Sequence, residues 1–190
     1  MSVDLDALNR RWQQSWPQCP PIGHLFRRHM PDRWVRFHSL PFGQRYPTNA
    51  ADYTTLLQRY NAILGELAPT EIYLITVEYP AHDLAAGTEP THVGLHPDAV
   101  NWMRAVDPDD PGASYDLRVS RQHFTAGGLD PLLRYIADDQ AREVVITDTS
   151  LSWLYHPYDG GMDVILPSAT QRDHFKARFT NWLSTRPDGL

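Results

Sequence analysis

WLYHPYDGGMDVILP (Trp153–Pro167) is the stretch that decides the fold, and it predicts a β-hairpin. Two runs rich in aromatic and β-branched residues, 153–156 and 162–166, flank the segment 157–161. Asp-Gly is typical of hairpin turns because both residues tolerate positive φ angles, and the second glycine allows a bulge. We expect a connection of about four or five residues whose turn type stays open. Turn chemistry by itself explains Asp159, whose side chain can cap its own backbone.

The composition predicts one soluble domain. The chain has 190 residues, 42% of them hydrophobic and 21% charged, which argues against disorder. Its net charge is −6 and Lys176 is its single lysine, so we expect neither nonspecific nucleic-acid binding nor membrane binding. The N-terminus resembles no signal peptide and no run of residues is apolar enough to span a membrane. The single cysteine, Cys19, excludes an intrachain disulfide and favours a cytoplasmic location.

Apolar residues at helical spacing predict the helices. Leu5, Leu8 and Trp12 predict an N-terminal helix over about residues 3–15 that packs on the rest of the domain. A longer stripe predicts a helix over residues 50–67, with Thr48 or Asn49 as its cap. We expect one further helical turn at residues 24–29, a helix with its N-cap at residue 130, and a last helix that begins at the capping box 168–171.

The remaining apolar runs predict strands. Residues 34–40, 71–79, 115–120 and 143–147 are rich in β-branched and aromatic residues. Residues 99–106 fit a helix or a strand, and the short stripe favours a strand. We therefore expect an α+β fold over residues 1–190 as a single domain. It would have a mixed or mainly antiparallel sheet of about five to seven strands, with helices packed chiefly on one face.

Two stretches resemble a known group of proteins. WVRFHSLP (34–41) with RYP (45–47), and LYHPYDGGMDV (154–164), resemble a family of uncharacterised bacterial proteins, mainly actinobacterial, that carry a domain of unknown function. The resemblance covers most of the chain. It implies a family label and transfers neither an activity nor catalytic residues.

The same two stretches supply a candidate pocket, provided that the strand 34–40 lies beside the hairpin. Arginines would bind an anion there, a histidine would act as acid or base, and an aspartate would orient it. The simpler interpretation pairs Arg36 with an acid and places His38 at a solvated sheet edge. The candidate residues are Arg36, His38, Arg45, Tyr155, His156, Tyr158 and Asp159, and Asp163 is close to them in sequence.

We expect no metal and no cofactor. His82, Asp83, His92 and His96 are of the types that bind transition metals, but the chain has no His-Glu-x-x-His and no paired Cys-x-x-Cys. Histidines in such a loop are expected to be solvated. Nucleotide-binding glycine loops and the Gly-x-Ser-x-Gly motif of hydrolases are also missing from the sequence.

Two functions fit these observations. The first is a non-catalytic binding or interaction protein, immunity-type or regulatory, with a protein partner. The second is a small enzyme that acts on an anionic substrate through an Arg/His/Asp cluster of Arg36, His38 and Asp159. The missing catalytic motifs and the acidic composition favour the first. The sequence leaves the oligomeric state open.

Overall fold

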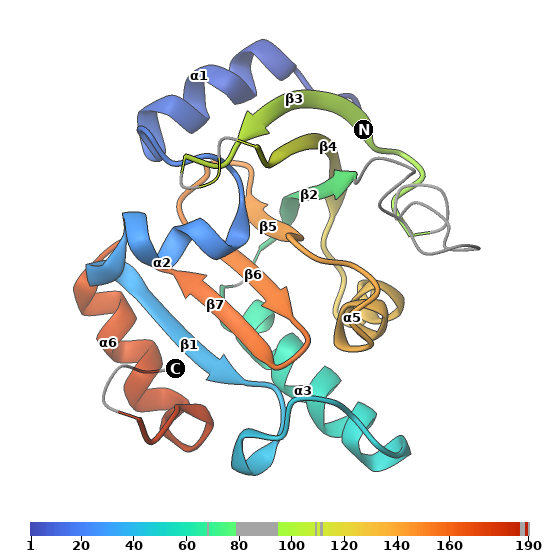
Figure 1. Ribbon diagram of the computed structural model, residues 1–190, viewed down its shortest axis with the longest axis vertical. Helices are drawn as coiled ribbons and strands as arrows, with labels where there is room; N and C mark the ends of the chain where they lie inside the picture. Colours follow the sequence, from blue (N-terminus) through green and yellow to red (C-terminus); the bar gives the residue numbers. More distant parts are fainter. Residues whose placement is uncertain (68, 79–94, 109, 111, 187–188, 190) are drawn as a thin grey trace.

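Seven antiparallel strands form one sheet in the computed structural model, in the order β1-β7-β6-β5-β2-β4-β3 (Figure 1). The structure describes residues 1–67, 69–78, 95–108, 110, 112–186 and 189. The strands are β1 (Trp34–His38), β2 (Glu71–Glu78), β3 (Val100–Val106), β4 (Ser114–His123), β5 (Val145–Asp148), β6 (Leu154–Tyr158) and β7 (Gly161–Ile165). The α-helices are α1 (Leu5–Ser15), α2 (Phe26–His29), α3 (Ala50–Leu67), α5 (Asp130–Ala137) and α6 (Ala169–Arg178). Short 3₁₀ turns include η1 (Gly23–Leu25) and η3 (Pro41–Gly43).

The predicted hairpin is β6 and β7, but its turn is tighter than expected. Tyr158 pairs with Gly161, so only Asp159 and Gly160 connect the two strands. Neither residue has a positive φ, so the predicted four- or five-residue connection with left-handed residues is wrong. The reason is that strand pairing continues to the tip. Gly161 is needed for a different reason: a Cβ there would lie 2.2 Å from the carbonyl oxygen of Phe37 on β1.

Strand β1 brings together the two stretches, 34–41 and 154–164, that resemble the family of uncharacterised proteins. It pairs antiparallel with β7 along its full length, so Arg36 lies opposite Asp163. On the other side of β7, Asp163 lies opposite His156 of β6. Residues that lie opposite each other on paired strands point to the same face of a sheet. Arg36, Asp163 and His156 therefore form one row on one face.

Two apolar cores lie on opposite faces of the sheet. The larger one packs α3, α5 and α6 against side chains such as Phe37 and Tyr155. The other packs α1 and the segment that includes α2 against Leu154 and Ile165. The α+β fold with an antiparallel sheet is thus confirmed, and α1 packs on the domain with Trp12 1% exposed. Within the described residues, no helix has the length and apolar character that crossing a membrane requires.

Local details confirm some of the expected caps and correct others. Asn49 accepts hydrogen bonds from two backbone N–H groups at the start of α3, and Ser168 accepts one from Gln171 at the start of α6. The predicted N-cap at Asp130 is wrong, because this residue lies inside the first turn of α5. Its carboxylate accepts a hydrogen bond of 2.7 Å from Asn61 instead. The ambiguous segment 99–106 is a strand, as favoured.

Candidate functional site

A cleft of about 420 Å³ lies over β1, β7 and β6. The row of Arg36, Asp163 and His156 forms part of its lining. The rest comes from η1 and α2, from the loop that follows η3, from the hairpin tip, and from the loop between α5 and β5. Five of the seven candidate residues line it: Arg36, Arg45, His156, Tyr158 and Asp159. The cleft residues that the candidate set did not include are His24, Arg27, Asp139, Ala141, Arg142, Glu143 and Asp163.

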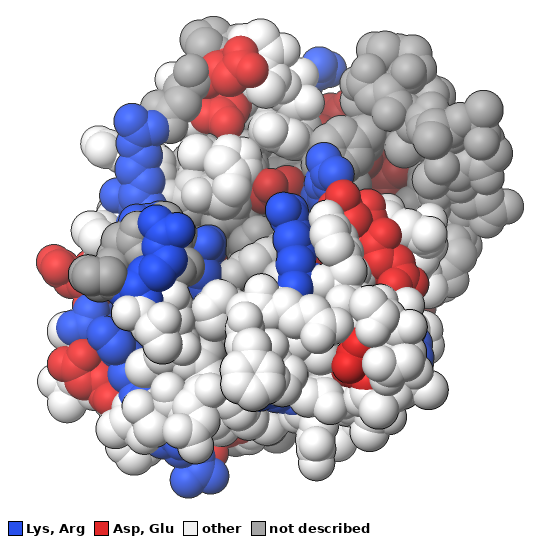
Figure 2. Space-filling model, turned by 60° about the horizontal axis from the view of Figure 1, so that its bottom comes forward, with Lys and Arg blue, Asp and Glu red and all other residues white. Residues whose placement is uncertain are grey.

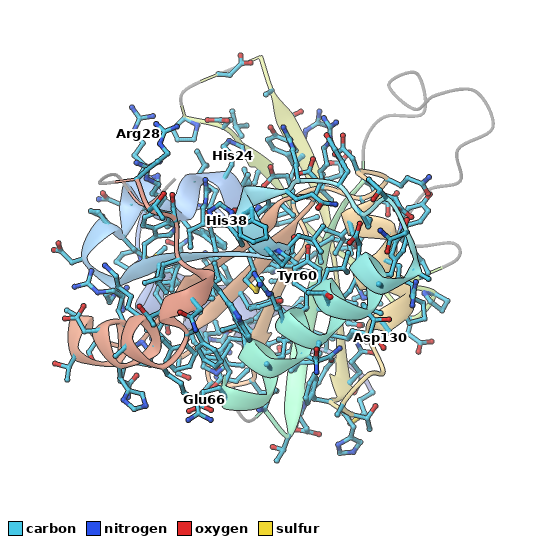
Figure 3. The ribbon with its side chains drawn as sticks, turned by 90° about the horizontal axis from the view of Figure 1, so that it is seen from below. His24, Arg28, His38, Tyr60, Glu66 and Asp130 are labelled. Atoms are coloured by element: carbon cyan, nitrogen blue, oxygen red, sulfur yellow. The ribbon has the colours of Figure 1, made fainter. Side chains whose placement is uncertain are left out.

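Two candidate residues do not line the cleft. Tyr155 alternates with His156 and therefore points to the opposite face, where it is fully buried and its hydroxyl lies 3.5 Å from the carbonyl oxygen of Tyr60. Burial raises the pKa of the Tyr155 phenol. His38 shares its face with Arg36 but lies at the end of β1, and burial, with the charges of Arg36 and Arg59, lowers its pKa. Figure 3 shows His38 and Tyr60 relative to the sheet.

A bidentate ion pair forms the floor of the cleft. The Nε and Nη2 of Arg36 donate to the two carboxylate oxygens of Asp163 at 2.7 and 2.8 Å. The Asp163 side chain is only 3% exposed, so the pair is shielded from water on the carboxylate side. The Arg36 guanidinium also lies 5.0 Å from the centre of the Tyr158 ring. Two parallel charge-assisted hydrogen bonds fix the orientation of both side chains.

A second ion pair lies at the hairpin tip. Asp159 is 6% exposed, which is unusual for an acid in a turn. Its carboxylate accepts a 2.7 Å hydrogen bond from Nε of Arg45, and this bond raises the pKa of Arg45. The two residues are 114 positions apart, so turn chemistry alone does not account for Asp159.

Another side of the cleft is formed around His24, which links three parts of the chain. Its Nδ1 lies 2.9 Å from Glu143 and its Nε2 3.0 Å from Asp107, and its backbone N–H donates to Glu143 at 3.1 Å. The hydrogen bond to Glu143 is the main reason that the pKa of His24 rises to about 9, so at neutral pH the ring is an imidazolium. Burial opposes ionisation of Glu143, yet the bond with His24 and the nearby His156 lower its pKa overall. In Figure 3, His24 and Arg28 project from the N-terminal segment, across the sheet from Glu66 and Asp130.

The conformation of Glu143 explains why the sequence did not predict the side of the cleft that this residue forms with His24. The sequence predicted a strand over 143–147, whereas β5 begins at Val145 and Glu143 has a φ of 55°. His24 falls in a predicted helical turn, and nothing local to either residue indicates a contact across 119 positions. The one signal in the sequence for this side of the cleft was the group of acids with an arginine at 138–143, just before the buried strand.

His156 is held in one orientation by its surroundings. Its Nδ1 donates to the carbonyl oxygen of Val144 at 2.8 Å, and the residue is 5% exposed. Turn η1 lies directly on the ring, because a Cβ on Gly23 would come within 2.2 Å of Nδ1. At the rim of the cleft, Arg142 makes two hydrogen bonds to Asp139 at 2.8 and 2.6 Å, which lower the pKa of Asp139.

The cleft can bind polar groups but is poorly equipped for nucleophilic chemistry. Among the described residues, its lining contains no Ser, Thr or Cys side chain. Its carboxylates are held by cations, and its histidines by an acid or a carbonyl. An outer recess of about 600 Å³, lined by His24, Arg27, Arg28, Pro31 and Trp34, adjoins the cleft through His24 and Arg27.

The candidate metal ligands do not form a site in the described part of the chain. His82, Asp83 and His92 lie outside it. His96 is buried, with its ring nitrogens 3.0 Å from the Thr76 hydroxyl and 2.7 Å from the Ser120 hydroxyl. Both nitrogens are therefore engaged within the protein and the ring is not solvated as expected. Over the described ranges, no three His, Cys, Asp or Glu side chains are grouped to hold a metal ion.

Comparison with known proteins identifies a family to which most of the chain matches. No curated protein and no solved structure matches the chain significantly. A family model matches residues 22–187, a range that contains every residue that lines the cleft and leaves out α1. With most of its length matched, the chain belongs to the family described as Domain of unknown function (DUF3885).

Proposed function

We propose that the protein is a non-catalytic binding protein, immunity-type or regulatory, that recognises a protein partner at the cleft. One observation carries the proposal: the charged side chains of the cleft are held in place by internal ion pairs before any ligand arrives. Arg36 with Asp163 and Arg45 with Asp159 are the two central pairs. Side chains that are fixed in advance lose little conformational entropy on binding, which favours recognition.

The charge pattern favours a polar, charged partner segment over an apolar one. Cations and acids alternate across the cleft, from Arg45 and Asp159 at the hairpin to Arg142 and Asp139 at the rim. Exposed cations at the edge of such a surface steer and orient a partner. The guanidinium-bearing side chains of Arg45 and Arg142 are 64% and 63% exposed, so they are available for contact while they hold their carboxylates.

The experiment compares two tagged variants with the wild-type chain in extracts of the source organism. Arg142→Glu reverses a charge at the rim, and Arg104→Glu makes the same change on β3, where the side chain is 66% exposed and outside the cleft. We expect the wild-type chain and Arg104→Glu to retain one stoichiometric partner. Arg142→Glu should bind the purified partner at least about tenfold more weakly by calorimetry. Equal retention by all three chains, or no stoichiometric partner, would count against the proposal.

The alternative is a small enzyme that acts on an anionic substrate through an Arg/His/Asp cluster. Of the predicted cluster, Arg36 and Asp159 line the cleft but His38 does not. His156 lies there with four arginines, which is the observation in favour of this function. However, Asp159 pairs with Arg45, and Nδ1 of His156 donates to a backbone carbonyl and not to a carboxylate. Its test is turnover of phosphate and carboxylate esters by the wild-type chain and by His156→Gln. Turnover that the variant loses would replace the binding proposal.

We also propose a bacterial origin and a cytoplasmic setting. The resembling stretches 34–41 and 154–164 support the first. The single cysteine, Cys19, supports the second, because a chain without a second cysteine has no intrachain disulfide, as is usual where thiols stay reduced. Fractionation of the source cells with an antibody to the chain tests the location. Recovery from the medium or from the membrane fraction would contradict it.

A further inference from the structure

Phe42 in the turn η3 is the most exposed large apolar side chain in the described part of the chain, at 107%. The other phenylalanines are buried or half-buried, as is usual for this residue type. Turn η3 follows β1 and lies at the lower end of the molecule in Figure 1. Figure 2 turns that end toward the reader, and lysines, arginines and acids are sparse over the lower centre and denser above it. The turn thus presents an aromatic ring to solvent on a surface with few charges that adjoins a charged one.

The backbone of Phe42 is strained. Its φ of 57° and ψ of 21° lie in the left-handed region, which bulky side chains rarely adopt. Glycine or asparagine would adopt this conformation more easily. Because the ring is fully exposed, packing within the chain does not account for a phenylalanine at this position. Strain of this kind is typical of sites that contact another molecule.

Hydrogen bonds hold the segment 41–48, which we call the 41–48 loop, in one conformation. The Asp52 carboxylate on α3 accepts hydrogen bonds from the backbone N–H and the hydroxyl of Thr48, at 2.8 and 2.9 Å. It also accepts one of 3.0 Å from the side chain of Gln44, which donates as well to the carbonyl oxygen of Tyr46 at 2.8 Å. The position of Phe42 is therefore fixed before any partner arrives, which reduces the loss of conformational entropy on binding.

The 41–48 loop also borders the cleft. Its Arg45 lines the cleft and is held by Asp159 through a 2.7 Å hydrogen bond. The Arg45 guanidinium lies 5.4 Å from the centre of the Tyr46 ring, and the two side chains are 64% and 45% exposed. Arginine and aromatic side chains are enriched among the residues that carry most of the binding energy at protein interfaces. A partner in the cleft thus meets the same loop that carries Phe42.

We propose that Phe42 is the apolar anchor residue for the protein partner and enters an apolar pocket on that partner, while the cleft receives the charged groups beside the pocket. This inference rests on the proposed function, because it names a contact of the same partner. A protein fits this surface better than a lipid bilayer does. Surfaces that bind membranes are rich in unpaired lysine and arginine, whereas Arg45 pairs with Asp159 and the loop is fixed on the acid Asp52. An apolar centre with a charged rim is the usual anatomy of a protein interface.

The experiment measures binding and stability in the same variants of the full chain. The protein that the wild-type chain retains from extracts of the source organism is purified and titrated by calorimetry. Phe42→Asn removes the ring and suits the left-handed backbone, and Val106→Thr removes an exposed apolar side chain on β3, outside the loop and the cleft. We expect Phe42→Asn to bind at least about tenfold more weakly and Val106→Thr to bind like the wild type. The melting temperature of Phe42→Asn should equal or exceed that of the wild type, because the strain is relieved.

The outcomes separate this inference from the proposed function. A partner that binds Phe42→Asn as tightly as the wild type overturns this inference and leaves the proposed function standing, whereas the absence of any stoichiometric partner overturns both. A lowered melting temperature in Phe42→Asn would assign the ring a structural role and overturn the inference. Sedimentation of the wild-type chain with vesicles of phosphatidylcholine and phosphatidylserine, or its dimerisation, would overturn it as well if Phe42→Asn loses that property. Phe42 would then contact a membrane or a second copy of the chain.

Discussion

At the scale of single residues, His24 is a charged link between two acids, and its effect depends on pH. Its folded-state pKa of about 9 lies above the ordinary value of 6.5. The stabilisation is therefore fully present below about pH 6.5 and is lost as the pH rises through about 9. Between about pH 6 and pH 9.5, the wild-type chain should lose about 1 kcal/mol more unfolding free energy than His24→Gln, a figure reduced for the 42% exposure of the side chain. Urea unfolding at both pH values measures this. Parallel losses in both chains would show that the link contributes nothing.

Neighbouring glycines at the hairpin tip should respond differently to the same change. Gly161→Ala places a methyl group against the Phe37 carbonyl of β1 and should cost about 1–3 kcal/mol of unfolding free energy. Gly160→Ala meets its nearest side-chain atom at 3.4 Å and should stay within about 0.5 kcal/mol of wild type. Denaturant titrations of the two variants give the comparison. A similar cost for both would mean that the approach of β1 to Gly161 is not close.

Residue chemistry shows why the sequence predicted only part of the cleft. Arg36, His156, Tyr158 and Asp159 follow from strand alternation and from the position of the turn, and the same alternation excludes Tyr155. The bonds of His24 to Glu143 and Asp107 cross 119 and 83 positions. No local pattern encodes such contacts, because they depend on which loops the fold brings together.

At the scale of elements, α1 should contribute strongly to stability although it lies outside the matched family range. Trp12 is 1% exposed, donates from its indole to the Cys19 carbonyl at 2.7 Å, and packs edge-on against Trp102 with ring centres 5.6 Å apart. Trp12→Ala should cost about 3–5 kcal/mol, whereas the exposed Gln13→Ala on the same helix should cost less than about 0.5 kcal/mol. Thermal and urea unfolding test this. A near-neutral Trp12→Ala would mean that α1 is not docked in solution.

Element types were more predictable than element partners. The long apolar stripe of α3 and the continuous apolar run of β2 determine a helix and a buried strand by local periodicity alone. The place of β1 beside β7 could only be assumed, since strand order depends on the burial of both sheet faces together. The predicted start of β5 was wrong, because the strand begins at Val145 and Glu143 lies outside it with a φ of 55°.

At the scale of the whole molecule, the two cores should unfold together. Strand β2 contributes Leu74 to one core and Ile75 to the other, so neither core persists without the sheet. We expect a single calorimetric transition whose measured enthalpy equals its van't Hoff enthalpy. Two resolved transitions would show that the chain contains independent folding units.

The pairing of β1 with β7 has a consequence for synthesis of the chain. Trp34–His38 leaves the ribosome long before Gly161–Ile165 exists, so the edge of the sheet stays incomplete until most of the chain has been translated. Folding then requires closure of a loop of more than a hundred residues, which slows the search for native pairing. Meanwhile Val35 and Phe37, which are buried in the finished protein, remain open to wrong contacts. In cells, yield should therefore depend on growth temperature and chaperone supply as much as on the stability of the folded protein.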